Sequence, residues 1–320
     1  MARMLLPFLA VLVTFARAAP TPLFGINLDS GKESEGKTTA VSQDEITANI
    51  LRPALFSRTA YCSAQSVTNW SCGAPCDAIP NVEVLAAGGD DGAIPGFFIA
   101  SDPDSQTIVV AHQGTDPHKI LSIANDIEFA QVDANTTLFP QAGSDVQLHS
   151  GFQDTQGRTA DLVMSTVQSG LSSTGFKRVL VTGHSLGAAV ASLDAAMLRM
   201  ALPDDVEVDS VVFGLPRVGN QAWADLFDSM FPEFIHVTNQ DDIVPTVPPH
   251  ALNFEHPSGE IHITAVNNGT GDATMVACPG QENQNCSAGK SLADITDDSI
   301  PNHLGPYLAG ISFGDKACPA

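Results

Sequence analysis

The segment Gly183-His184-Ser185-Leu186-Gly187 has the G-x-S-x-G pattern of a serine held in a tight turn. The pattern alone is weak evidence because glycine and serine are common, but its context strengthens it. The apolar residues 178–182 before it predict a buried strand, and the alanine-rich residues 188–202 after it predict a helix. A strand–turn–helix presents the hydroxyl above a helix N-terminus, which favours developing negative charge. We therefore predict that Ser185 is a nucleophile, with the backbone N–H of Leu186 in an oxyanion hole.

A serine nucleophile needs a base, and on this kind of scaffold an acid and then a histidine follow it along the chain. The apolar residues 234–237 predict a strand, and the loop after it contains Asp241 and Asp242, which are equal candidates on these grounds. The later histidines are His250, His256, His262 and His303. The alternation around His262 is typical of a strand, whereas His303 lies in a loop-like stretch near the end of the chain. Chain order favours His303 as the base.

The elements that would position these residues alternate between strands and helices. Residues 97–100 and 107–111 predict a hairpin, residues 159–171 a helix, and residues 208–213 a further strand. Ser42 and Glu45 form a capping-box pattern that opens a helix, which Pro53 should bend or end. This alternation predicts an α/β fold around a mostly parallel sheet, and we expect one catalytic domain over residues 41–320.

The charge balance narrows the range of partners. Asp and Glu outnumber Lys and Arg by 36 to 14, which gives a formal net charge of −22. Such a chain repels nucleic acids and anionic membranes, so we expect no nucleic-acid partner and a neutral substrate. Neither paired C-x-x-C motifs nor an H-E-x-x-H motif occurs in the sequence, so we expect no metal and no cofactor.

The N-terminus has the pattern of a secretory signal. Arg3 precedes the apolar residues 4–15, and Ala16-Arg17-Ala18 resembles a cleavage site. The apolar run is too short to span a bilayer, so we expect a signal peptide over residues 1–18 and no integral membrane span. Residues 19–40 are polar and lack apolar periodicity, which predicts a pro-segment or disordered arm. The protein should therefore be secreted.

The cysteines and sequons agree with an extracellular protein. Six cysteines allow 15 pairings, among which we favour Cys62–Cys318, Cys72–Cys76 and Cys278–Cys286. Four N-x-S/T sequons predict glycosylation, at Asn69, Asn135, Asn268 and Asn285. Asn285 is the weakest of them, because Cys286 is its middle residue.

With these pieces assembled, residues 45–318 resemble the fungal class 3 triacylglycerol lipase family, which also contains feruloyl esterases. Several segments carry the resemblance, and they occur in the expected order: residues 146–152, 181–189, 213–220 and 242–249. The resemblance implies an α/β-hydrolase fold with helices on both faces of the sheet. It also implies that the acid is Asp242 rather than Asp241, and that His256 lies in a non-catalytic segment.

The resemblance implies a second oxyanion donor and a lid. The donor would be Thr115, in the loop after residues 107–111; many members have Arg-Gly where this chain has Gln113-Gly114. An amphipathic stripe beside this loop is similar to the family's short helical lid, which would cover the serine in water and turn toward an oil surface. Its apolar residues are Ile120, Leu121, Ile123, Ala124, Ile127 and Phe129.

We therefore expect a secreted serine esterase that hydrolyses acylglycerols at an oil–water interface, acting as a monomer. Three alternatives stay open: a feruloyl or cinnamoyl esterase on the same fold, a non-catalytic binding protein on a hydrolase scaffold, and a secreted serine peptidase. The sequence has no peptide-binding signature that would favour the peptidase. The chain contains two tyrosines, and neither lies in the predicted lid, which favours lipid esters over the feruloyl alternative.

Overall fold

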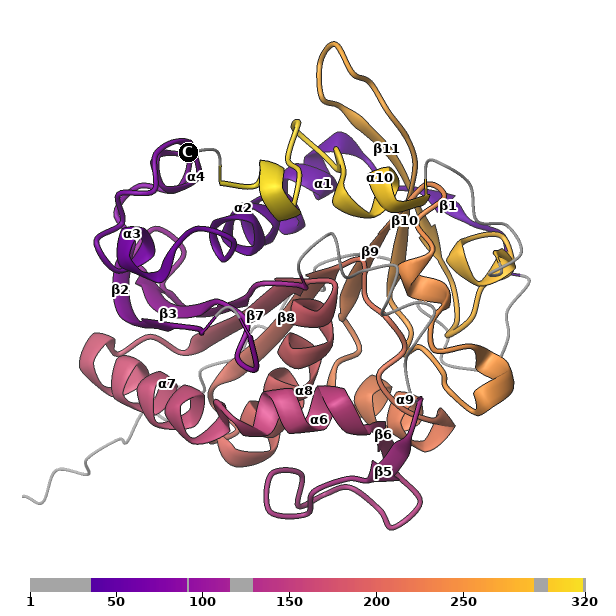
Figure 1. Ribbon diagram of the computed structural model, residues 1–320, viewed down its shortest axis with the longest axis horizontal. Helices are drawn as coiled ribbons and strands as arrows, with labels where there is room; N and C mark the ends of the chain where they lie inside the picture. The colour runs from indigo at the N-terminus through magenta and orange to yellow at the C-terminus, as the bar shows by residue number, and fades with distance from the viewer. Residues whose placement is uncertain (1–35, 91, 116–128, 291–298, 319–320) are drawn as a thin grey trace, which may run out of the picture.

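The computed structural model describes residues 36–90, 92–115, 129–290 and 299–318. A nine-stranded sheet forms its centre, in the order β1-β11-β10-β9-β8-β7-β4-β3-β2 (Figure 1). The five central strands run parallel: β4 (Thr107–His112), β7 (Arg178–His184), β8 (Glu207–Phe213), β9 (Ile235–Asn239) and β10 (Glu260–Val266). The flanking strands are antiparallel: β1 (Thr39–Ala40), β2 (Glu83–Gly88), β3 (Phe97–Asp102) and β11 (Ala273–Cys278). The parallel centre is the one that the alternation predicts.

Helices cover both faces of the sheet (Figure 1). One face carries α1 (Gln43–Asn49), α2 (Leu51–Thr59) and α10 (Ser299–Leu304). The other carries α6 (Ser150–Gly157), α7 (Ala160–Thr174), α8 (Leu186–Ala201) and α9 (Gln221–Met230). Side chains of a strand alternate between faces. On β8, Val212 therefore packs into the core under α8, while Val211 and Phe213 pack into the core under α1 and α2.

The helix that follows the proposed nucleophile is buried on nearly all sides. Residues 187–198 of α8 are all buried, which is expected of a helix without a polar face. Its many alanines let it lie close to β7 and β8, which it contacts along most of their length. The helix begins at Leu186, two residues earlier than its alanine-rich pattern predicts, because the turn at Ser185 leads directly into it.

Two local expectations need correction. The capping box at Ser42 and Glu45 is present and starts α1, but the break in the helix lies at Ile50 and not at Pro53. Pro53 stands in the first turn of α2, where its missing N–H leaves no intrahelical bond unmade. The second concerns the expected arm: its last residues, Thr39 and Ala40, pair with β11 as β1. Unpaired N–H and C=O groups at the edge of β11 attract this short extended segment.

Three disulfides join the same pairs that the sequence analysis favours: Cys62–Cys318, Cys72–Cys76 and Cys278–Cys286. The first connects the end of the α2 region with the C-terminal segment across 256 residues.

All four sequon asparagines are exposed, and glycosylation there remains a prediction. Among the described residues, none of the helices has the length and apolar character needed to cross a bilayer. The remaining short elements are α3 (Ala64–Thr68), α4 (Ala74–Asp77), β5 (Gln131–Asp133), β6 (Gln147–His149), η1 (Val244–Thr246), η2 (His250–Leu252), η3 (Ser287–Gly289) and η5 (Gly314–Lys316).

Candidate active site

Ser185 occupies the sharp turn between β7 and α8. Its backbone has φ 61° and ψ −125°, in a region that residues with a side chain rarely adopt, so the turn holds the residue under local strain. Its N–H donates to the carbonyl of Phe213 at 3.0 Å, which ties the turn to the end of β8. A Cβ atom on Gly183 would lie 2.3 Å from Gly187 O, and one on Gly187 would lie 2.4 Å from His112 O. Both neighbouring positions therefore need glycine.

Asp242 and His303 form a buried pair. The distance from Asp242 Oδ2 to His303 Nδ1 is 2.8 Å, and both side chains are almost fully excluded from solvent. The other oxygen of Asp242 accepts the N–H of Val244 at 2.8 Å. Asp241 instead pairs with Lys290, and about half of its side chain is exposed. The adjacent aspartates thus have different partners, and the one that contacts the histidine is the one that the resemblance favours.

His303 lies on α10 and not in a loop, which corrects the expectation from its sequence context. Proline at the third position of this helix is compatible with its first turn, so the Pro-Asn-His sequence does not prevent a helix. His303 Nε2 is buried and has no hydrogen-bond partner among the described residues, Ser185 Oγ included. Hydrogen bonds between a nucleophile and its base are often unmade in the absence of substrate, so this arrangement is compatible with catalysis.

Two close approaches place His303 beside the serine turn. The His303 ring lies 4.4 Å, between centroids, from the ring of His184, the residue that precedes Ser185. A Cβ atom on Gly214 would lie 2.8 Å from His303 Cε1, and Gly214 follows the residue whose carbonyl holds the Ser185 N–H. The ends of β7, β8 and β9 therefore bring the three predicted residues to one edge of the sheet.

The other candidate histidines have different partners. His250 is half-exposed and pairs with Glu255, with 2.6 Å between Nδ1 and Oε2. His256 is buried and its Nε2 donates to the carbonyl of Pro245 at 2.8 Å. His262 lies on β10, as its alternation predicts, and contacts the hydroxyl of Thr238.

The loop after β4 is anchored by Gln113. Its N–H donates to Gly96 O at 2.7 Å, and its side-chain Oε1 accepts the N–H of Gly96 at 2.9 Å. This pair of bonds fixes the loop to the residue directly before β3. A Cβ atom on Gly114 would lie 2.8 Å from Ser185 Cβ, so the loop packs directly against the serine.

Thr115, the predicted oxyanion donor, directly follows Gly114. Its hydroxyl is buried and has no hydrogen-bond partner among the described residues. A buried hydroxyl without a partner is costly, so a group of this kind is a candidate to bind a ligand atom. The lid residues Ile120, Leu121, Ile123, Ala124 and Ile127 lie outside the described residues; Phe129 lies just after them and is partly buried.

Arg217 and Glu282 hold the acid loop, and sequence reasoning missed Glu282. Arg217 forms two bonds of 2.8 Å with the Glu282 carboxylate, and its Nη1 donates to the carbonyls of Thr246 and Pro248. Burial on its own raises the pKa of Glu282, but the Arg217 guanidinium outweighs it and lowers this pKa to about 2. The pair is separated by 65 residues, and no local motif connects the two positions.

Replacing Glu282 with glutamine should destabilise the protein in a pH-dependent way. The folded pKa lies below the unfolded one, so the carboxylate stabilises fully above about pH 4.5 and progressively less as the pH falls toward 2. We expect Glu282→Gln to lower the free energy of unfolding by about 3 kcal/mol at pH 7, and by less below pH 4. Urea unfolding of both proteins between about pH 3 and pH 7 measures this difference in the free energy of unfolding. Asp205→Asn, in an exposed pair with Lys177, is the control; a difference for Glu282→Gln that is constant with pH would contradict the account.

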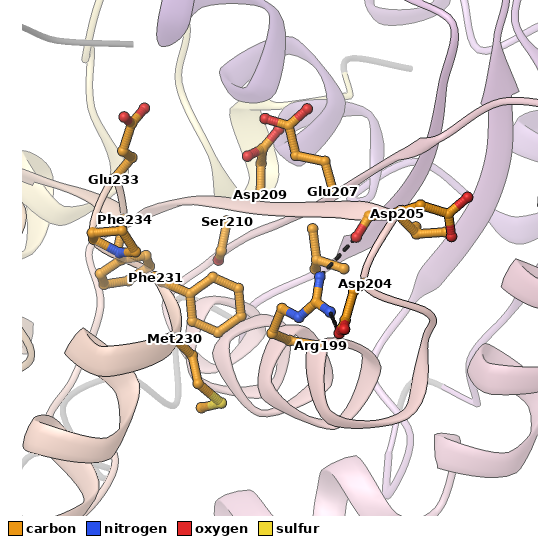
Figure 2. A pocket seen from close by; sticks show the side chains of 13 residues that line it. Arg199, Asp204, Asp205, Glu207, Asp209, Ser210, Met230, Phe231, Glu233 and Phe234 are labelled. Atoms are coloured by element: carbon orange, nitrogen blue, oxygen red, sulfur yellow. Dashed lines mark hydrogen bonds and ion pairs between the residues drawn. The ribbon is translucent and has the colours of Figure 1, made fainter. Parts of the chain in front are cut away.

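A separate pocket of about 430 Å³ lies at the opposite end of β8 (Figure 2). The first residues of β8 line it, together with the ends of α8 and α9, and Arg199 pairs there with Asp204. Ser185, Asp242 and His303 do not line it. This pocket is therefore distinct from the site at the carboxyl ends of the strands.

Comparisons with known proteins agree with this geometry. Residues 109–252 match the family described as Lipase (class 3). The secreted mono- and diacylglycerol lipase LIP2 of Malassezia restricta is 35% identical over 202 residues, 63% of this chain and 61% of that protein. This match therefore spans less than two thirds of the relative's length. The LIP4 protein of the same organism, which has the same description, is 33% identical over 246 residues, 76% of this chain and 78% of that protein.

Solved structures of lipases share the fold. A lipase of Rhizopus microsporus var. chinensis has a TM-score of 0.75 and 26% identity, covering 89% of this chain and 93% of its own. A triacylglycerol lipase whose catalytic centre is described as a serine protease triad has a TM-score of 0.73 and 26% identity, covering 88% of this chain and all of its own. The sheet, the turn at Ser185 and these relatives lead to one assignment: the chain belongs to the class 3 lipase family and has the α/β-hydrolase fold.

Proposed function

We propose that this chain is a secreted serine esterase that hydrolyses the ester bonds of acylglycerols through an acyl-enzyme on Ser185. The observation that carries the proposal is the buried Asp242–His303 pair, in which Nε2 has no partner in the described part of the chain and lies on a ring packed beside the Ser185 turn. The names of the Malassezia relatives, secreted mono- and diacylglycerol lipases, support the compartment and the substrate class.

In the first half of the reaction, His303 Nε2 takes the proton of Ser185 as the serine oxygen attacks the ester carbonyl. The resulting oxyanion receives hydrogen bonds from the Leu186 N–H and from Thr115, whose buried hydroxyl has no partner among the described residues. His303 then gives its proton to the leaving alcohol, and the acyl group stays on Ser185.

In the second half, water takes the place of the alcohol and His303 repeats its role as base. Asp242 contacts Nδ1, so it keeps the proton on that nitrogen, leaves Nε2 free to act, and stabilises the imidazolium that forms. The carboxylate itself is held by the N–H of Val244. The contacts of Asp242 thus support its role in orienting His303, and those of His303 support its role as the base.

The substrate class follows from charge and from the resemblance. A net charge of −22 disfavours anionic lipids and is compatible with neutral acylglycerols. We further propose that the lid stripe of residues 120–129 covers Ser185 in water and turns aside at an oil surface, where burial of its apolar residues favours the open form.

A comparison of substrates tests this function. Tributyrin should be hydrolysed at a rate that rises sharply once its concentration exceeds solubility, since the oil surface opens the lid. Methyl ferulate should be hydrolysed at least about 100-fold more slowly, because on this proposal the site selects aliphatic acyl chains over a rigid aromatic acid. Release of acid is measured by titration at constant pH. A smooth saturating curve with tributyrin would contradict the lid, and faster hydrolysis of methyl ferulate would make the chain a feruloyl esterase.

A further inference from the structure

We propose that Tyr61 and His184 form a buried relay that positions the oxyanion loop and His303 relative to each other. The inference rests on the proposed function, since it assigns these two residues to the same reaction as positioning residues. Neither side chain belongs to the triad. Their contacts connect four segments of the chain: the end of the α2 region, the loop after β4, the serine turn, and α10.

The hydrogen bonds of His184 define its tautomer. Its Nε2 lies 2.9 Å from the backbone carbonyl of His303, which can only accept, so Nε2 carries the proton. Burial, and then the nearby His303, keep the pKa of His184 well below its ordinary value, so the ring is neutral and Nδ1 is an acceptor. The Tyr61 hydroxyl lies 2.6 Å from Nδ1 and therefore donates to it.

The other side of the Tyr61 hydroxyl contacts the oxyanion loop. Burial raises the pKa of Tyr61 above its ordinary range, although a backbone hydrogen bond from Gly114 opposes this shift, so the phenol stays protonated. The same oxygen lies against the backbone of Gly114 while the hydroxyl donates to His184. A Cβ atom on Gly114 would lie 2.5 Å from the Tyr61 oxygen, so the approach is close. Gly114 directly precedes Thr115, the proposed oxyanion donor.

The C-terminal segment encloses this relay. Phe313 stacks on His184, with 4.3 Å between ring centroids, and also packs against the ring of Tyr61. Cys62, the residue after Tyr61, is joined to Cys318. His184 is fully buried and Tyr61 is partly buried, so water has little access to the hydrogen bonds between the oxyanion loop at one end and the proposed base at the other. Within a water-excluded site such bonds are strong and their geometry is well defined.

The relay should affect the chemical step more than substrate binding. Without the phenol oxygen, His184 Nδ1 loses its partner and the Gly114 backbone loses the oxygen that it packs against, so Thr115 and His303 lose their common anchor. The oxyanion exists only in the transition state, so a misplaced donor lowers kcat while leaving KM nearly unchanged.

Tyr61→Phe tests the relay, because it keeps the ring against Phe313 and removes only the hydroxyl. We expect kcat to fall by about 10- to 100-fold, with KM within about twofold of the wild type. The second readout is the combination with Thr115→Val. If Tyr61 acts through the oxyanion loop, its loss should lower kcat by no more than about threefold once Thr115 has been removed.

Tyr307→Phe is the matched comparison. Its hydroxyl donates to the same His303 carbonyl at 3.1 Å, but the three atoms nearest to a Cβ atom on Gly114 belong to His184, Tyr61 and Ser185. The factor by which Tyr307→Phe lowers kcat should therefore multiply with the factor for Thr115→Val in the double variant. His184→Gln interrupts the relay at its other end and should show the same non-multiplicative pattern as Tyr61→Phe, which keeps the proposal testable if one variant fails to fold.

Labelling of Ser185 by a fluorophosphonate separates the possible failures. A wild-type protein that is not labelled would overturn the proposed function. A labelled wild type with an unchanged kcat in Tyr61→Phe, a change in KM alone, or an effect that multiplies fully with Thr115→Val would overturn the relay and leave the function standing. Non-multiplicative losses of kcat in both Tyr61→Phe and His184→Gln support it.

Discussion

Ser185→Ala should lower kcat by at least about 10⁴-fold, because the residual rate then comes only from binding and the oxyanion donors. The fold should be unaffected. Alanine is smaller than serine, and the backbone bond from residue 185 to Phe213 O does not need the hydroxyl. Ester hydrolysis and thermal unfolding, measured on the same preparation, check both parts of the prediction.

Ser192→Ala is the matched control for this substitution. Ser192 lies two helical turns further along α8, is equally buried, and donates its hydroxyl to the carbonyl of Ala188. Its loss should leave activity within about twofold, because helix hydroxyls bonded to a preceding carbonyl contribute little. More than about 1% residual activity in Ser185→Ala would remove the serine from the mechanism.

Asp242→Asn should lower kcat by about 10³- to 10⁴-fold. The amide is nearly isosteric, but its NH₂ group can turn toward His303 and favour the tautomer with the proton on Nε2, which cannot act as a base. It also removes the charge that stabilises the imidazolium. Since Asp242 and His303 are both buried, solvent cannot substitute for the lost carboxylate. Steady-state kinetics on a soluble ester measure the effect.

The neighbouring residue supplies a stringent control. Asp241→Asn changes the same functional group one position earlier, but its partner is Lys290 and its side chain is half-exposed. We expect an effect of at most about threefold, as is usual for exposed ion pairs. Equal losses in the two variants would mean that the assignment of the acid is wrong.

Local sequence patterns were sufficient for the nucleophile and for much of the fold. The strand, the glycine-flanked serine and the alanine-rich helix are contiguous, so one segment contains the information for the turn at Ser185. Alternating apolar runs likewise predicted the parallel centre of the sheet. The preference for His303 needed chain order in addition, and the preference for Asp242 needed the family resemblance.

Local patterns were misleading where a segment's structure depends on what covers it. The sequence around His303 predicts a loop, but the segment forms a helix. The end of the expected arm forms an edge strand. Both segments are short, and short elements acquire most of their stability from tertiary packing rather than from propensity. Residues 116–128, which include most of the predicted lid, lie outside the described residues, so that prediction stays untested.

By itself, the sequence determined the nucleophile turn, the order of the triad candidates and the layered α/β fold, because each of these depends on residues that are close in the chain or on simple periodicity. Only the tertiary structure decided which aspartate contacts His303, that Glu282 binds Arg217, and that Tyr61 contacts His184. These partners are separated by 61, 65 and 123 residues. Such contacts depend on how the sheet and its loops pack together, and a buried polar group must find its partner in that packing, whatever its distance along the chain.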